Sequence, residues 1–458
     1  MAAHRTGDFL SGVIEGFYGP PWSQAERFEL FKWMADWGLN TYVYAPKDDL
    51  KHRALWRKPY SAAEAKTLGT LCRSCAKRRL RFIYALSPGL DMRYSREQEL
   101  GHLRKRFEQL MALGCRDFAL LFDDIPDRLE AADRTRFGSF AAAQSHVVNT
   151  MFRWLRDRAP RARLLFCPTP YCGMMADRKF GGEAYLETVG RELLPGIDIF
   201  WTGPDIISRE ITIPHIRQLQ GLLRRKPLIW DNLHANDYDG RRFFCGPYSG
   251  RPPALRKEVS GLLLNPNTEF PLNFVPLRTL AAFLNCRGKW NPRRAYLSAM
   301  RDWFPRFATV GQPVALADLV LLGDCYYLPH EEGPEAETLC KGIRTSIAES
   351  PHQRGRGVLF PAAATRLHSF CVRLTELRHR PLFNALSRRI WDLREELALL
   401  ENYARFRASG HPARKAFRSD FHLPGTYRGG ILSRLQQLLA LRPDGTFEPG
   451  KPVAKGAD

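Results

Sequence analysis

Two adjacent carboxylates stand at the end of an apolar run, in the stretch LLFDDIPD at residues 120–127. Like charges in a partly dry site disfavour each other's ionised form, so the pair of Asp123 and Asp124 lowers stability unless it has a use. General acid–base chemistry is such a use, because one carboxyl group can donate a proton while its neighbour stays ionised. The structural alternative is a helix cap, or a turn that Pro126 opens.

The elements that would position this pair alternate along the first 300 residues, where longer amphipathic segments separate short apolar runs. Such alternation is typical of parallel strands joined by crossover helices. The clearest helix is the segment 61–80, which opens with Ser61 as its N-cap and has Glu64 three residues later. Eight strand–helix units predict a (β/α)8 barrel of the TIM type, an α/β fold. The expected strands are residues 9–19, 41–46, 81–89, 117–125, 163–171, 197–204, 227–232 and 259–267.

Polar residues or glycine follow the apolar body of every expected strand. Packing alone does not need them, whereas the active site of a TIM barrel lies at the C-terminal ends of its strands. The pattern therefore favours a functional site over a helix cap. In strand order the residues are Gly16 and Tyr18, Lys47 and Asp48, Ser87, Asp123 and Asp124, Thr169 and Tyr171, Thr202, Asp231 and Asn232, and Asn265. Two segments keep a structural alternative: residues 230–240 could form a plain surface loop, and the aromatic residues of 16–22 could be core.

The composition indicates a globular chain of two domains. It has 458 residues, 44% of them hydrophobic, and no uninterrupted apolar run approaches the roughly 18 residues of a membrane-spanning helix. The N-terminal segment lacks the apolar core of a secretory signal, so we expect a cytoplasmic protein. The ten cysteines include one CxxC, Cys72 and Cys75, without a second pair to complete a metal site. Reduced thiols fit the cytoplasm.

The formal net charge of +21 raises the possibility of nucleic-acid binding. The basic residues are spread along the chain rather than gathered in one tail or stripe, and no RNA- or DNA-binding signature accompanies them. A solvated, arginine-rich surface that attracts acidic partners is therefore favoured, with no nucleic acid as a main partner.

The alternation stops after about residue 300. Residues 295–307 are expected to form a helix that leads out of the barrel, and residues 362–408 repeat apolar side chains at three- and four-residue steps. This spacing predicts amphipathic helices, which Pro381 divides, and so an all-α bundle. The predicted organisation is an N-terminal segment 1–8, a barrel domain 9–310, a helical stalk domain 311–442 and a disordered tail 443–458. Residues 352–358 and 410–415 are expected to be loops.

Several motifs together resemble the O-GlcNAcase family, glycoside hydrolase family 84. They are GVIEGFYGPPW, NTYVYAPKDDLKHR, FIYALSPGLD, FALLFDDI, FCPTPYCG, WTGP, WDNLHANDYD and LNPN, and they recur in order through about residues 8–280. Residues 315–336 and 421–439 are similar, more weakly, to the helical stalk of the animal enzymes. As the resemblance reads, the chain lacks the acetyltransferase-like domain of the long animal forms and is similar to compact bacterial relatives.

The resemblance implies an exo-acting β-N-acetylglucosaminidase that removes O-linked N-acetylglucosamine from Ser or Thr of proteins, without a metal or other cofactor. In that family the acetamido oxygen of the substrate attacks the anomeric carbon, and water opens the resulting oxazoline with overall retention. By this match Asp123 would orient and polarise the acetamido N–H. Asp124 would be the general acid for the leaving oxygen and then the general base for water.

The resemblance also implies substrate-binding positions. Lys47 and Asn265 would bind sugar hydroxyls, and Asp237 would bind the 4- and 6-hydroxyls. Asn232 would bind the acetamido region and Tyr171 the acetamido oxygen, in an N-acetyl pocket with Trp230 and Cys167 as walls. Gly16 would let the backbone approach the sugar, and Tyr238 would line the site. A homodimer through the stalk is implied as well.

Two alternatives to this function stay open. A non-catalytic glycan-binding module would not need the general acid that Asp124 supplies. A hyaluronidase-like endo-glycosidase would not need Asp237 as a floor for terminal hydroxyls.

Overall fold

The computed structural model describes residues 9–348, 360–409, 416–419 and 429–450. The chain folds into two compact units. The first comprises the residues up to 237 together with 248–270 and 277–292, and the second comprises 238–247, 271–276 and the residues from 293 onwards. The domain prediction placed the division after residue 310, and the segments 238–247 and 271–276 group with the second unit rather than with the barrel.

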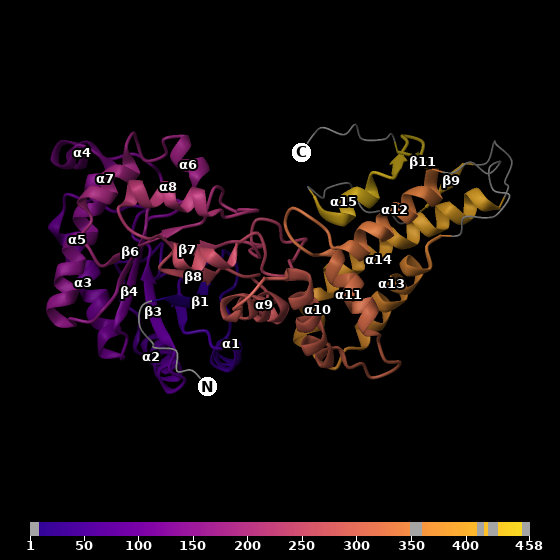
Figure 1. Ribbon diagram of the computed structural model, residues 1–458, viewed down its shortest axis with the longest axis horizontal. Helices are drawn as coiled ribbons and strands as arrows, with labels where there is room; N and C mark the ends of the chain where they lie inside the picture. The colour runs from indigo at the N-terminus through magenta and orange to yellow at the C-terminus, as the bar shows by residue number, and fades with distance from the viewer. Residues whose placement is uncertain (1–8, 349–359, 410–415, 420–428, 451–458) are drawn as a thin grey trace. The chain divides into compact units, whose positions relative to one another are not determined.

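Eight parallel strands close into a barrel in the first unit, which confirms the predicted TIM fold (Figure 1). Closure comes from β1, which pairs with β2 in the register Gly12 to Thr41 and with β8 in the register Leu10 to Gly261. The strands are shorter than predicted, because the polar residues that follow each apolar body turn into loops. Their bounds are β1 (Leu10–Glu15), β2 (Thr41–Tyr44), β3 (Arg81–Leu86), β4 (Asp117–Leu121), β5 (Leu164–Cys167), β6 (Ile197–Trp201), β7 (Leu228–Asp231) and β8 (Gly261–Leu264).

Helices surround the strands of the barrel (Figure 1). Ser61 begins α2 with the predicted capping box, in which Glu64 returns a hydrogen bond to the cap, and Ser23 and Glu26 do the same for α1. The helices are α1 (Gln24–Asp36), α2 (Ala62–Lys77), α3 (Glu97–Ala112), α4 (Ala131–Phe137), α5 (Phe140–Arg158), α6 (Gly173–Asp177), α7 (Tyr185–Glu192), α8 (Ile213–Leu223) and α9 (Phe274–Asn285), with short 3-10 turns η1 (Pro253–Lys257) and η2 (Phe270–Asn273).

Apolar side chains from every strand fill the interior of the barrel. They form one buried cluster that also contains Tyr171 beyond the end of β5 and Trp230 on β7. The strand residues in it are Leu10, Ile14, Val43, Ile83, Ala85, Ala119, Leu121, Leu165, Cys167, Phe200, Leu228 and Leu263. Since the strand bodies are packed, a ligand can enter only beyond the strand ends.

A buried ion pair ties the first loop to the barrel. Glu15, the last residue of β1, is fully buried and accepts hydrogen bonds from Arg27 Nε at 2.8 Å and Arg27 Nη2 at 2.6 Å. It also accepts from the Tyr42 hydroxyl and from the backbone N–H of Trp22 at 3.0 Å. These bonds fix both ends of the loop 16–22, which carries residues of the candidate site.

The second unit is mainly helical, which confirms the predicted bundle. Pro381 lies in the first turn of α14, where its missing N–H costs no helical hydrogen bond, and this explains why the predicted run divides there. The elements are α10 (Pro292–Trp303), η3 (Phe304–Phe307), α11 (Leu316–Cys325), α12 (Pro334–Ala348), α13 (Ala362–Arg373), η5 (Leu374–Glu376), α14 (Arg380–Ala408) and α15 (Gly430–Gln436), with a small antiparallel sheet of β9 (Phe417–Arg418), β10 (Leu439–Leu441) and β11 (Thr446–Pro449).

Part of the predicted disordered tail is a strand, and here the prediction was wrong. Residues 446–449 form β11, which pairs with β10 and β9. Gly445, at φ +80°, makes the tight turn between β10 and β11, and the buried Phe447 ring lies 6.0 Å from that of Phe417. The Pro/Gly-rich composition hid this hairpin. Residues 451–458, the N-terminal segment 1–8 and the predicted loops 352–358 and 410–415 lie outside the described residues.

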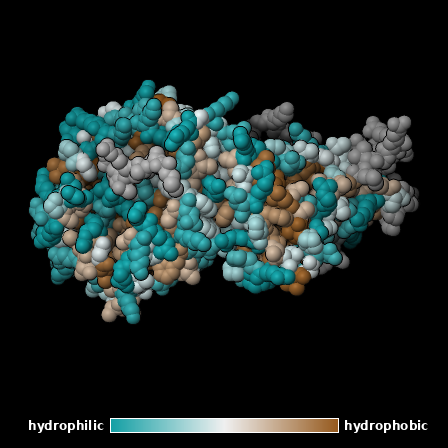
Figure 2. All heavy atoms as spheres, turned by 60° about the horizontal axis from the view of Figure 1, so that its bottom comes forward, coloured by the Kyte–Doolittle hydropathy of each residue, from teal (hydrophilic) through white to brown (hydrophobic). Residues whose placement is uncertain are grey.

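The face of the molecule drawn in Figure 2 is mainly hydrophilic. Hydrophobic residues are exposed between the hydrophilic ones. Of the helices that the structure describes, none is both long and apolar enough to cross a membrane.

Arg27→Met should destabilise the barrel, because it leaves the Glu15 carboxylate buried without its cation. We expect the free energy of unfolding to fall by about 3–5 kcal/mol, measured by urea denaturation at pH 7. Arg217→Met is the control, since Arg217 forms an exposed pair with Glu258 and should leave the urea midpoint unchanged. Equal midpoints for the two variants would contradict a supporting role of the buried pair.

Candidate active site

The acid pair lies at the C-terminal rim of the barrel, just beyond β4. The N–H of Phe122 donates to the carbonyl of Cys167 at 2.9 Å, and the Phe122 carbonyl accepts from Thr169 Oγ1 at 2.9 Å. These bonds prolong the contact between β4 and the β5 side by one residue. The chain then turns, so that Asp123 and Asp124 stand at the rim rather than in the packed interior.

Asp123 is buried and ionised. It is only 4% exposed, and its Oδ2 accepts a hydrogen bond from Lys47 Nζ. Burial raises the pKa of this carboxyl, but the charge and hydrogen bond of Lys47, together with the charge of Arg53, lower it below the ordinary value. Its other oxygen, Oδ1, is buried and has no hydrogen-bond partner among the residues that the structure describes. The site thus presents a charged acceptor that is held in place from one side.

Asp124 has different surroundings. Its side chain is exposed, Tyr171 donates to its Oδ1 at 2.7 Å, and Tyr18 donates to its Oδ2 at 3.0 Å. Burial, and then the nearby Asp124 charge, raise the pKa of both phenols well above the ordinary value, so both hydroxyls stay protonated as donors. One carboxylate is thus buried against a cation, and its neighbour is accessible between two hydroxyls. Such a division allows two adjacent acids to have separate roles.

An arginine that the sequence analysis did not single out binds the backbone of the pair. Arg53 Nη2 donates to the carbonyl oxygen of Asp124 at 2.6 Å, and Nη1 lies 3.4 Å from that of Asp123. Nη1 also lies 3.3 Å from Ser87 Oγ, beyond the end of β3.

A relay of amides joins three strand ends beside the acids. Asn265, after β8, accepts from the N–H of Gly16 at 3.3 Å and donates to Asn232 Oδ1 at 3.0 Å. Asn232 in turn donates to the carbonyl of Ile206 at 2.8 Å. Both Asn side chains are buried, at 4% and 8% exposure, so they are oriented before any ligand arrives.

Trp230 and Cys167 form part of the apolar wall of the site, in the same buried cluster as Tyr171. A Cβ added to Gly16 would lie 2.4 Å from Trp230 Cζ2, so the indole occupies the space that a side chain would need. The structure shows this close approach of Trp230 to Gly16, and the approach of a sugar to the Gly16 backbone stays a prediction. Burial raises the pKa of the Cys167 thiol and keeps it neutral.

Asp237 lies near the same rim, where its Oδ2 accepts from the N–H of Tyr18 at 2.9 Å. Tyr238 differs from the other candidates. It groups with the second compact unit, is 51% exposed, and stacks on Phe244 with ring centroids 6.4 Å apart. The barrel unit therefore brings together every candidate residue from the sequence except Tyr238.

The sequence analysis missed functional contacts for which it had weak signals. Tyr18 and Ser87 were noted at strand ends without a role in the site, although Tyr18 contacts Asp124 directly. Arg53 belongs to the basic stretch KDDLKHR, but it follows β2 by several residues, so the strand-end pattern could not reveal it. Within the described ranges, no group of three or more His, Cys, Asp or Glu side chains could hold a metal ion.

Comparison with known proteins agrees with this geometry. The family model of β-N-acetylglucosaminidase matches residues 11–313. The chain is 48% identical over 275 residues to the protein O-GlcNAcases of Rattus norvegicus and Mus musculus, a match that covers 60% of this chain and 30% of each relative. A solved structure of an Asp-to-Asn mutant of the Thermobaculum terrenum O-GlcNAc hydrolase is similar with a TM-score of 0.73 and 28% identity, over 87% of both chains.

These matches and the fold place the chain in the class of TIM-barrel proteins of the glycoside hydrolase type. The chain belongs to the β-N-acetylglucosaminidase family, which is the O-GlcNAcase family that the motifs indicated. It spans 30% of the length of the curated relatives that it matches.

Removing the Lys47 charge should change how stability depends on pH. In the wild-type chain the pKa of Asp123 lies below its ordinary value of 3.8, so its ionised form contributes stability at neutral pH that is lost as the pH falls through the folded-state pKa. In Lys47→Met the positive charge that offsets the effect of burial on Asp123 is smaller, and we therefore expect the pKa of Asp123 to rise above the ordinary value. The difference in unfolding free energy between the wild type and Lys47→Met should therefore be greatest at pH 7 and should become smaller towards about pH 4.

The measurement is urea denaturation of both proteins at several pH values. Lys226→Met is the control, because exposed Lys226 donates only to the carbonyl of Lys257 among its described contacts. A difference between wild type and Lys47→Met that stays constant with pH would show that Lys47 does not hold Asp123 ionised.

Proposed function

We propose that the chain is a retaining exo-β-N-acetylglucosaminidase, which removes O-linked N-acetylglucosamine from Ser or Thr of proteins by substrate-assisted catalysis. The observation that carries this proposal is the unequal environment of two adjacent acids. Asp123 is a buried carboxylate with one open acceptor, and Asp124 is an accessible carboxyl group. Family membership and the activity in the names of the relatives support it.

In this mechanism Asp123 acts on the acetamido group of the substrate. Its open Oδ1 accepts the acetamido N–H, which turns the acetamido oxygen towards the anomeric carbon. As the carbon–oxygen bond forms, positive charge develops on the oxazoline ring, and the ionised carboxylate stabilises it. Lys47 keeps Asp123 ionised for this purpose. An adjacent acid can be tolerated because no carboxylate has to attack from the opposite face of the sugar.

Asp124 handles the proton. It protonates the leaving Ser or Thr oxygen as the glycosidic bond breaks, and then accepts a proton from the water that opens the oxazoline. Its exposure lets both a leaving group and water reach it. Tyr171 donates to Asp124 in the free protein, and we propose that it transfers this hydrogen bond to the acetamido oxygen when substrate binds.

The remaining residues would form the sugar pocket. The amides of Asn232 and Asn265 are buried and held by hydrogen bonds, and they would bind the acetamido region and a sugar hydroxyl respectively. Trp230 and Cys167 would supply an apolar wall for the N-acetyl methyl group. Asp237 would hold the 4- and 6-hydroxyls of a terminal sugar, which favours exo over hyaluronidase-like endo cleavage. A non-catalytic glycan-binding module is the other alternative, and the experiment below separates the three.

The first test is hydrolysis of nitrophenyl β-N-acetylglucosaminide, compared with the matching β-glucoside and with an O-GlcNAc peptide. We expect cleavage of both N-acetylglucosaminides and none of the glucoside, because the glucoside lacks the attacking acetamido oxygen. Asp123→Asn should lower kcat about 100-fold or more on either substrate. Retention is checked by NMR of the first-formed anomer.

Asp124→Asn separates the two steps. Because nitrophenolate needs little protonation, its release by this variant should show a rapid burst followed by slow turnover. Hydrolysis of the Ser-linked sugar should be about 100- to 10,000-fold slower than in the wild type and should show no burst. Binding of N-acetylglucosamine without turnover by folded wild-type protein would favour the binding module. Cleavage of internal bonds in hyaluronan would favour the endo-glycosidase.

We place this activity in the cytoplasm, with O-GlcNAc-bearing proteins as substrates. All ten cysteines are free thiols, and nine of them are buried, as expected for a reducing compartment.

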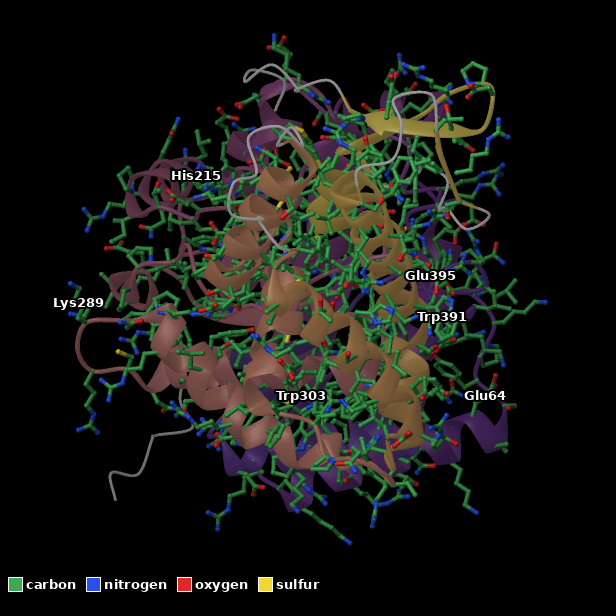
Figure 3. All side chains as sticks on the ribbon, turned by 90° about the vertical axis from the view of Figure 1, so that its right-hand side faces the viewer. Glu64, His215, Lys289, Trp303, Trp391 and Glu395 are labelled. Carbon is green, nitrogen blue, oxygen red and sulfur yellow. The ribbon has the colours of Figure 1, made fainter. Side chains whose placement is uncertain are left out.

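We also propose a homodimer through the helical unit. Figure 3 shows Trp391 and Glu395 on one face of α14. Trp391 is 47% exposed, with the Arg394 guanidinium 3.4 Å from its ring centroid, and Val372 on α13 is 41% exposed. Exposed aromatic and aliphatic side chains of this kind favour burial against a second copy.

Trp391→Glu should weaken this dimer, because it places a charge in the contact. Sedimentation equilibrium should show at least a tenfold rise in the dimer dissociation constant, which corresponds to about 1.4 kcal/mol. Leu441→Glu is the matched control, since Leu441 is 46% exposed on β10, and it should leave the dimer intact. A monomeric wild-type chain at micromolar concentration would contradict the proposal.

A further inference from the structure

Asp124 has a backbone conformation that few residues with a side chain adopt. Its φ is +51°, in the left-handed region. Four other described non-glycine residues share this region, at Arg79, Lys179, Ala184 and Arg224, and all four lie within two residues of a helix end, at α2, α6, α7 and α8 respectively. Asp124 instead lies between a strand and a loop, at a residue whose carboxyl group must be aimed. Such a conformation persists only where the surroundings hold it.

Arg53 forms hydrogen bonds that can stabilise this backbone conformation. Its guanidinium donates to the carbonyl oxygens on both sides of the turn, at 2.6 Å to Asp124 and 3.4 Å to Asp123. A planar guanidinium can bridge two acceptors in fixed directions, which a lysine ammonium cannot. The bonds reach the main chain rather than the carboxylates, so they are unaffected when Asp124 gains or loses a proton.

Arg53 is itself fixed against the barrel. It is 8% exposed and also contacts Ser87 Oγ at 3.3 Å. The preceding residue, His52, is fully buried, with its carbonyl accepting from the Ser87 N–H at 2.9 Å and its Nδ1 2.8 Å from the carbonyl of Ala85. Burial and the Lys47 charge lower the pKa of His52 to about 4, so the ring is neutral and can donate from Nδ1. The end of strand β3 therefore fixes the position of Arg53.

We propose that Arg53 is a positioning residue for the acid pair, which sets the direction of the Asp124 carboxyl group by holding the peptide carbonyls on either side of it. This inference rests on the proposed glycosidase function. Arg53 touches no reacting atom, and its effect on catalysis passes through the geometry of Asp124 and, through its charge, the ionisation of Asp123.

Two variants separate geometry from charge. Arg53→Lys keeps the charge but cannot bridge the two carbonyls, and Arg53→Met removes both. A misaimed general acid should matter most where the leaving group needs a proton, so Arg53→Lys should lower kcat/KM about 10- to 100-fold for a Ser-linked or alkyl N-acetylglucosaminide and only a few-fold for the nitrophenyl one. A merely structural defect would lower both rates by the same factor.

The pH profile reports the charge. Asp123 must be ionised, so removing a nearby positive charge raises its pKa and moves the acidic limb of kcat/KM to higher pH. We expect this shift in Arg53→Met and not in Arg53→Lys.

Arg57→Met is the matched control in the same loop. Its guanidinium pairs with Asp91 at 2.6 Å and Glu99 at 2.8 Å, and bonds to neither member of the acid pair. It should leave both rates and the pH profile unchanged, and circular dichroism and thermal midpoints are recorded for every variant.

The outcomes are distinguishable. If the wild-type chain cleaves none of these sugars, the proposed function is wrong. If it cleaves them and Arg53→Lys loses the same factor on all leaving groups, or none, the positioning role is wrong. Should Arg53→Met fail to fold, the leaving-group ratio of Arg53→Lys decides alone.

Discussion

The site depends on burying the charge of Asp123. A carboxylate taken out of water is strongly disfavoured unless a cation compensates it, and Lys47 does so at the point where β4 ends. Because Lys47 bonds to only one carboxylate oxygen, the other remains a buried, charged acceptor without a partner among the described residues. The neighbouring Asp124 can then stay accessible, since the two carboxyl groups do not share one environment.

Among the described residues, three buried carboxylates that pair with a cation lie at the C-terminal ends of barrel strands, and comparing them separates support from function. Glu15 pairs with Arg27 through both oxygens, and Asp231 pairs with Arg251 through both oxygens. Further donors complete each set, namely Tyr42 and Trp22 for Glu15, and Tyr248 and Leu233 for Asp231. Their hydrogen-bonding capacity is used within the fold, so they hold loops in place. Asp123 alone among the three keeps a buried oxygen without a partner in the described chain, which is the property expected of a residue that binds substrate.

Sequence periodicity was sufficient for the barrel, and the polar strand ends indicated where a candidate site would lie. Alternating apolar runs report which segments are buried, and the polar residues after them report which end of the barrel has a function. Periodicity does not report which loop side chain folds back over a strand end, so the bond from Tyr18 to Asp124 and the bonds from Arg53 to the main chain of the acid pair were not predicted. The contact of Lys47 with Asp123 was not predicted either, and the role on sugar hydroxyls that the family resemblance implies for Lys47 stays a prediction. The hairpin at residues 439–449 was hidden because its strands are short and its turn is rich in glycine and proline.

The adjacency of the two acids has a structural consequence that separated acids would not have. Both carboxyl groups are attached to one turn of main chain, so any movement of that turn displaces the two acids together, and with them the proposed acetamido partner and the proposed proton donor. Both cations that contact the acid pair, Lys47 and Arg53, come from the single loop after β2, and that loop is anchored to β3 through His52. Closure of the barrel fixes β2, β3 and β4 side by side, and this allows the loop of one strand to set the geometry at the end of another. In the proposed substrate-assisted mechanism neither acid has to attack the anomeric carbon, so both can stand on one turn of main chain.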